Sequence, residues 1–478
     1  MERLKEKRYI DSYAIVSVDD FFKKYSKSYK QVVVYDSNLA STINIATMFA
    51  SLNKGIVAAA SDISKYGNNK KITDLRGQWK TNADAYEWAL KKLWPKMNHN
   101  VIACYHPTDT DHRLRDYLIR HKIFCFWVTD KKTSDNISSS YNLELEFTKK
   151  LWASTRDNTA MIGFTEGTGS EKGLTEYFGV GLAGEYGKLM SVCNWSTSLS
   201  FYSGISVDID KIVSKYSKIR RAQTPALDNS KVYVAFAIVE SGDSPIYWQA
   251  VQRRVWEDPA RGQIPIGWSL GPTSFEIFGP IVEYFYDQAS ANDYFFLAVS
   301  GSAYVHPYRN FMSRTSNPEK SWARHLELLQ KYIDRLKMHQ IALYTDAWTK
   351  FDREKNDPVT LRFAELRDID MLIMGMGRDE NALEIGPNYM LGKRNAVVSH
   401  VVTRWDTANI GRNDKNNAWL AEEIRKNTPS ARPAFIVVHP LSWSYYPSDL
   451  VEVLKQLGSD YVAISLPDFC ELYKKANQ

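Results

Sequence analysis

Eight short apolar runs in the second half of the chain constrain its fold more than any other feature. Each run is five to nine residues long, and predicted helices lie between several of them. Runs of this length, rich in Val, Ile and Leu, predict strands buried on both faces, as in parallel sheets. Eight such strands within about 240 residues predict a (β/α) TIM-like barrel. The predicted strands are residues 231–239, 264–270, 294–300, 341–345, 370–374, 396–402, 434–439 and 461–465.

The first half of the chain alternates strands and helices over shorter distances, which predicts N-terminal α/β lobes with mostly parallel sheets. A polar stretch at residues 129–140 separates two such lobes, and the polar, proline-containing stretch at 220–230 separates both from the barrel. The predicted domains are an N-terminal α/β domain at 1–135, a second small α/β domain at 136–225 and the barrel at 226–478.

The composition argues against several classes of protein. Lys and Arg number 61 against 55 Asp and Glu, and a net charge of +6 without a basic stripe argues against a nucleic-acid partner. The four cysteines are too few and too scattered for a disulfide scaffold or a zinc site. The sequence also lacks HExxH and P-loop motifs and a metal-binding pair of histidines at a strand end, so we expect neither a metal nor a cofactor. No run of 18 apolar residues predicts a membrane span, and the charged first 16 residues do not resemble a signal peptide. The oligomeric state stays open.

Polar and aromatic side chains lie at or near the ends of the predicted barrel strands repeatedly. Because the carboxyl ends of parallel strands meet at one end of a barrel, we expect such residues to share a pocket. Carboxylates next to indole rings suit a carbohydrate, since the rings pack on sugar C–H faces and the carboxylates accept hydroxyl protons. For any single residue, an ordinary loop or turn role is the alternative. The residues selected in this way are Glu240, Asp243, Trp268, Asp346, Asp379, Asp406, His439 and Trp443.

Residues 301–307 read Gly-Ser-Ala-Tyr-Val-His-Pro and follow the third predicted barrel strand. Together with the acidic turn at 240–244, the stretches at 261–268 and 291–295, and Val438-His439, they resemble in order the GxGYxYP family, which is associated with glycoside hydrolysis. Residues 114–117 and 195–200 also look similar to the family's N-terminal part. The resemblance implies a C-terminal barrel related to glycosidase barrels, sugar processing, and a secreted bacterial protein whose leader has been removed.

Three positions depart from the family pattern. Ala303 stands at the second glycine of the name motif, His306 at its second tyrosine, and Ser241 at the first acid of the acidic turn, whereas Asp243 is retained. Either Glu240 replaces the lost carboxylate, or the chemistry of this member is altered. The alternative function is therefore a catalytically altered or inactive glycan-binding protein on the same scaffold. A cytoplasmic interaction protein is a third, weaker reading.

Hydrolysis of a glycosidic bond normally needs two carboxyl groups, one acting as an acid and the other as a base or nucleophile. We expect Asp243 to be one of them, because it follows a buried strand and a glycine. Glu240 and Asp346 are the first candidates for its partner, with Asp379 and Asp406 behind them. The residues expected to bind an oligo- or polysaccharide are Tyr304, His306, Trp268, Asp406, His439 and Trp443.

Overall fold

The computed structural model of the chain describes residues 1–108, 113–129, 137–163, 165, 174, 176–239, 244–345, 352–376, 387–402 and 415–478. The chain forms two compact units, Met1–Ser206 and Val207–Gln478. Within the described residues, no helix is both long and apolar enough to cross a membrane.

The first unit contains two parallel sheets, as the alternation of strands and helices predicted. Three strands pair in the order β2-β1-β3, and four pair in the order β5-β4-β6-β7. The second sheet joins strands from before and after residue 135, and the domain boundaries at 135 and 225 stay a prediction. The strands are β1 (Gln31–Val34), β2 (Gly55–Ala58), β3 (Lys71–Asp74), β4 (Asn98–Cys104), β5 (Ile123–Phe126), β6 (Thr159–Gly163) and β7 (Lys188–Ser191). The helices are α1 (Glu2–Glu6), α2 (Val18–Tyr25), α3 (Ser41–Asn53), α4 (Ile63–Tyr66), α5 (Asn82–Lys92), α6 (Arg115–His121), α7 (Ile137–Ser154), α8 (Glu176–Glu185) and α9 (Leu199–Tyr202), with 3-10 turns at Ala60–Asp62 and Trp94–Lys96.

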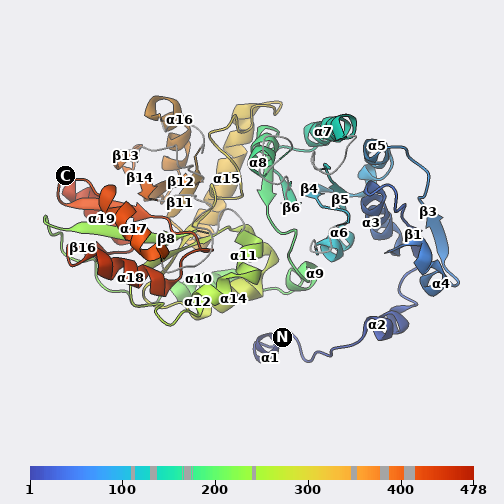
Figure 1. Cartoon of the computed structure of the whole chain (residues 1–478), viewed down its shortest axis with the longest axis horizontal. Helices are drawn as coiled ribbons and strands as arrows, with labels where there is room; N and C mark the ends of the chain where they lie inside the picture. The colour runs from blue at the N-terminus through green and yellow to red at the C-terminus, as the bar shows by residue number, and fades with distance from the viewer. Residues whose placement is uncertain are drawn as a thin grey trace. The chain divides into compact units, whose positions relative to one another are not determined.

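The second unit is a closed barrel of seven parallel strands, which confirms the predicted fold class. The ring runs β8-β9-β10-β11-β12-β14-β15 and returns to β8, and helices α16 and α18 lie on opposite sides of these strands in Figure 1. The strands are β8 (Val232–Ile238), β9 (Ile266–Leu270), β10 (Asp293–Leu297), β11 (Gln340–Tyr344), β12 (Met371–Met376), β13 (Tyr389–Leu391), β14 (Ala396–Val402), β15 (Ala434–Val438) and β16 (Tyr461–Ala463). The helices are α10 (Ile209–Ser217), α11 (Ser244–Ala250), α12 (Gln252–Trp256), α13 (Thr273–Ile277), α14 (Gly279–Asp287), α15 (Pro318–Leu336), α16 (Arg353–Ala364), α17 (Lys415–Lys426), α18 (Pro447–Leu457) and α19 (Leu466–Ala476).

All eight predicted strands of this region form, but only seven close the ring. Strand β16 pairs with Val232–Val234 of β8, and β9 pairs with Phe236–Ile238 along the same edge. The eighth predicted strand therefore occupies only the amino end of that edge, and β9 is the neighbour of β8 at the carboxyl end.

The pairing register decides which side chains face the barrel interior. Side chains at paired positions of neighbouring strands point to the same face. Following the register around the ring puts Phe296 and His439 on one face, and their rings lie 6.2 Å apart although β10 and β15 are not neighbours. That face is therefore the interior. Tyr344 shares the interior face, whereas Trp268 faces the helices.

Helix α19 fills the amino end of the barrel. A Cβ on Gly267, which faces the interior, would lie 3.0 Å from Leu466 Cδ1, and the rings of Phe435 and Phe469 are 5.4 Å apart. The linker packs nearby, where the Arg221 guanidinium lies 3.9 Å from the Tyr294 ring centroid. Because these contacts occupy the amino end, the carboxyl end is where a substrate would reach the strands.

Candidate active site

The loop at residues 300–307, called the motif loop below, is anchored by β11 and α15. The Ser300 backbone N–H donates to the carbonyl of Ala342 at 2.7 Å, and its hydroxyl oxygen accepts from the Tyr344 N–H at 3.0 Å. Gly301 has φ of 88°, and a Cβ there would lie 2.7 Å from Leu329 Cδ2. Glycine is required at this position for both reasons, since side chains rarely adopt that φ and Leu329 occupies the space.

Three rings gather where the motif loop meets the end of β11. The centroids of His306 and Tyr344 are 4.2 Å apart in a stacked arrangement, and Tyr304 lies 5.7 Å from each of them. Tyr304 and His306 are buried, whereas Tyr344 is half-buried. The structure therefore brings together two of the residues predicted from the sequence and adds Tyr344 to them. We call these three residues the ring cluster.

Tyr344 is a candidate site residue that the sequence analysis did not select. Ile341 pairs with Leu297, which faces the helices, so the regular alternation along β11 turns Tyr344, three residues later, to the interior. The nearby shift in register lies in β12, where Met376 pairs with Tyr344 directly after Met374 pairs with Leu343. A signal was present in the sequence, because Tyr344 ends an apolar strand two residues before Asp346. Only the register shows that its ring turns inward.

His439 and Trp443 follow β15 at the same end of the barrel. His439 faces the interior and is 1% exposed. Beyond it, the pairing of β8 with β15 continues through a bridge between Val239 and Leu441. Trp443 is half-buried and packs edge-to-face on Tyr247 of α11 with centroids 5.2 Å apart.

The burial of His306 and His439 makes the stability of the fold depend on pH. It lowers the pKa of each imidazole from about 6.5 to about 3, and Arg309 adds to the effect at His306. Because the unfolded chain binds these protons below pH 6.5 and the folded chain does not, the free energy of unfolding falls as pH falls from 6.5 towards 3. The slope is about 1.4 kcal/mol per pH unit for each histidine.

We therefore expect the loss of stability between pH 7.5 and pH 5 to be smaller in His439→Gln than in the unaltered chain. Urea denaturation at both pH values measures it. His99→Gln, which replaces an exposed imidazole, is the control and should lose as much stability as the unaltered chain. If His439→Gln loses as much stability as the unaltered chain between these pH values, His439 is not a source of the acid sensitivity.

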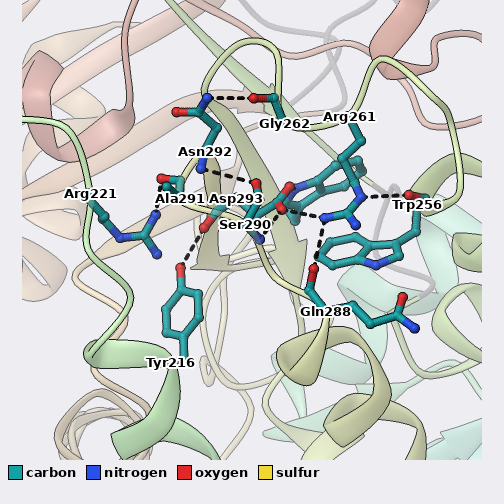
Figure 2. Close-up of polar contacts among 11 residues, drawn as sticks. Tyr216, Arg221, Trp256, Arg261, Gly262, Gln288, Ser290, Ala291, Asn292 and Asp293 are labelled. Carbon is teal, nitrogen blue, oxygen red and sulfur yellow. Dashed lines mark hydrogen bonds and ion pairs between the residues drawn. The ribbon is translucent and has the colours of Figure 1, made fainter.

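Trp268 and Arg261 belong to a buried network around Asp293. Figure 2 shows Arg261 and Asp293 in this network. The Arg261 guanidinium binds Asp293 Oδ2 at 2.5 Å and lies 4.2 Å from the Trp256 ring centroid, and the Trp268 indole N–H donates to Asp293 Oδ1 at 2.9 Å. Asp293 begins β10, at the amino end of the barrel. These contacts favour a packing role for Trp268 and a structural ion pair for Arg261, and we leave both out of the site proposed below.

The carboxylates selected from the sequence lie outside the described residues. This holds for Glu240, Asp243 and Asp346, for Asp406, and also for Asp379. In the sequence, Asp243 directly precedes α11, which begins at Ser244, and Asp346 follows Tyr344 by two residues. Among the residues that the structure does describe, no three His, Cys, Asp or Glu side chains gather as metal ligands would.

Comparison with known proteins identifies the family. Residues 230–474 match the model described as "GxGYxYP putative glycoside hydrolase C-terminal domain", residues 99–204 match "GxGYxYP third domain", and residues 29–97 match "GxGYxYP_N second domain". No curated protein matches the sequence.

Two solved structures resemble the chain. One, titled a putative hydrolase from Bacteroides thetaiotaomicron VPI-5482, is 18% identical with a TM-score of 0.75, and the match covers 99% of this chain and 86% of that one. The other, titled a putative polysaccharide deacetylase from Mycobacterium smegmatis, is 10% identical with a TM-score of 0.32 and covers 54% and 96%. The first likeness shows the fold alone, and the second carries no argument. Since its model for the C-terminal domain alone matches more than half of the residues, the chain belongs to the GxGYxYP family.

Proposed function

We propose that the chain hydrolyses glycosidic bonds of an oligo- or polysaccharide at the carboxyl end of its barrel. Membership of a family with this C-terminal domain supports a general hydrolase role. The observation that carries the proposal is the ring cluster, in which the half-buried Tyr344 turns inward beside His306 and Tyr304. Of the three rings, Tyr344 is the half-buried one, and a flat ring at a strand end suits the C–H face of a sugar.

The reaction in this proposal uses two carboxylates that follow barrel strands in the sequence. Asp243 is one, and Glu240 or Asp346 is the other. One protonates the glycosidic oxygen while the second attacks the anomeric carbon or activates a water molecule. Buried neutral imidazoles at His306 and His439 would offer hydrogen bonds without adding positive charge. Asp406 and Trp443 complete the proposed set of sugar contacts.

A glycan panel tests the proposed function. The purified chain is incubated with cello-, xylo-, malto- and chito-oligosaccharides and with uronic-acid-containing oligosaccharides, and reducing ends are counted. The same glycans are printed on a binding array. Turnover of at least one of them supports the proposal. Binding without turnover would instead favour the inactive glycan-binding protein that Ser241 suggests. If the chain neither binds nor hydrolyses any of these glycans, a carbohydrate function on these substrates is contradicted.

Tyr344 gives a sharper prediction for any glycan that the panel identifies. We expect Tyr344→Ala to raise KM about 10-fold, which corresponds to roughly 1.4 kcal/mol of lost stacking. Tyr344→Phe should stay within about twofold of the unaltered chain, because the ring is retained. Steady-state kinetics measures both. The matched control is Tyr473→Ala, which removes a half-buried ring near the amino end of the barrel, and it should leave KM unchanged.

A further inference from the structure

Helix α15 presents a buried histidine to the back of the motif loop. The helix begins after Asn317, whose side chain accepts from the Lys320 N–H, and it ends at Lys337 in the left-handed conformation. His325 lies on its buried face and is fully shielded from solvent. On the same helix, Leu329 packs against Gly301 of the motif loop. Two residues of α15, one helical turn apart, therefore meet consecutive residues of the loop.

The second of these contacts is a hydrogen bond. Ser302 Oγ lies 3.4 Å from His325 Nδ1, and Ser302 is itself 2% exposed. Phe311 and Trp322 surround the imidazole edge-on, with centroids at 5.1 Å and 6.0 Å. The Nε2 atom has no hydrogen-bond partner within the part of the chain that the structure describes. Ser302 is thus the polar contact recorded for this imidazole.

A histidine at this buried position costs more folding free energy than an apolar side chain of similar size. Burying a polar ring with one nitrogen unsatisfied costs about 1–3 kcal/mol, which a phenylalanine or leucine would avoid. Burial also lowers the pKa of the imidazole to about 4, so it is neutral at neutral pH. What the imidazole adds over an apolar side chain is a fixed polar contact to Ser302.

We propose that His325 is a positioning residue for the ring cluster. By holding Ser302, it fixes the motif loop so that Tyr304 and His306 stay against Tyr344. An effect of His325 on catalysis rests on the proposed function, whereas its role in fixing the motif loop does not. His325 itself touches none of the three rings in any recorded contact and acts through Ser302.

The experiment compares five full-length variants, the fifth being the conservative His325→Asn. His325→Phe keeps the volume and removes the hydrogen bond, Ser302→Ala removes the partner, and the double variant closes a mutant cycle. Ile333→Ala is the matched control, because Ile333 is buried on the same helix, eight residues beyond His325 and four beyond Leu329. Hydrogen exchange is followed by mass spectrometry in peptides covering residues 299–308 and 341–345. Those peptides contain the Ser300 and Tyr344 amides that anchor the loop.

We expect exchange of these peptides to be about 10-fold faster in His325→Phe and in Ser302→Ala, with no further increase in the double variant, since the two side chains act through one bond. After correction for global stability, Ile333→Ala should leave them unchanged. His325→Asn, whose amide can reach the place of Nδ1, should restore most of the protection. Additive effects in the cycle, or faster exchange in Ile333→Ala as well, would overturn the proposal.

Kinetics on a glycan hydrolysed by the unaltered chain form a separate arm. His325→Phe is expected to lower kcat/KM at least 10-fold, because small displacements of a site cost that much or more. If the unaltered chain hydrolyses no glycan, the proposed function fails while the exchange cycle still decides the role of His325.

Discussion

Replacing Asp243 by Asn is expected to reduce hydrolysis of the natural glycan about 10³-fold. Loss of a general acid or base typically costs 10² to 10⁴ in rate, and loss of a nucleophile at least as much. The chain reaches Asp243 from β8, whose pairing with β15 is extended by the bridge between Val239 and Leu441 at the carboxyl end of the barrel. Single-turnover and steady-state rates measure the loss, and a thermal melt of the same sample verifies that the variant is folded.

The partner of Asp243 is identified by parallel variants. Glu240→Gln and Asp346→Asn are made separately, and we expect one of the two to match the loss in Asp243→Asn. Asp287→Asn, on α14, is a control that should keep full activity. The anomeric configuration of the first product, read by NMR, then indicates whether the two carboxyl groups stand about 5 Å apart or further. Full activity in Asp243→Asn would remove this residue from the catalytic pair.

Replacing Asp293 by Ala is expected to destabilise the barrel by about 3–5 kcal/mol. The Asp293 carboxylate is 1% exposed and binds the Arg261 guanidinium, the Trp268 indole N–H and the Ser290 backbone N–H. Removing it leaves a charged group and two donors without their acceptor in a buried place, which is the costly way to break a buried ion pair. For a unit of this size, the melting temperature should fall by roughly 10 °C.

The exposed pair between Arg335 and Asp210 is the comparison for that prediction. Its side chains are 47% and 73% exposed, and such pairs are worth less than about 1 kcal/mol. Asp210→Ala should therefore melt within about 2 °C of the unaltered chain, and Asp293→Asn should fall between the two. A loss below 1 kcal/mol in Asp293→Ala would show that the network in Figure 2 contributes little to stability.

Much of the barrel was readable from local sequence. The apolar runs at 231–239 and 434–439 are strands because Val and Ile-rich segments of that length bury both faces, and that property is local. Strand β3 shows the reverse case, since Lys71-Ile-Thr-Asp74 is polar and mostly exposed and carries no apolar signal. The number of strands that close the ring could not be predicted from local sequence, because it depends on which part of β8 pairs with β9 and which part pairs with β16.

The candidate site was predicted only in part. Tyr304 and His306 were selected, and they do lie together, because a short loop keeps near neighbours close. The direction of Trp268 was not predictable, since a strand buried on both faces has no apolar alternation that distinguishes interior from exterior. Tyr344 and His325 required the tertiary structure, the first through the pairing of β11 with β10 and the second through a helix that begins 11 residues after the loop.

The sequence by itself determined the barrel strands, the order of the α/β lobes and the barrel, and the motif that names the family. The tertiary structure decided how many strands close the ring, which end is filled, and which side chains turn inward. The division has one physical reason. Strand formation and loop composition depend on residues a few positions apart, whereas register, closure and the face of each side chain depend on pairings between strands tens to hundreds of residues apart.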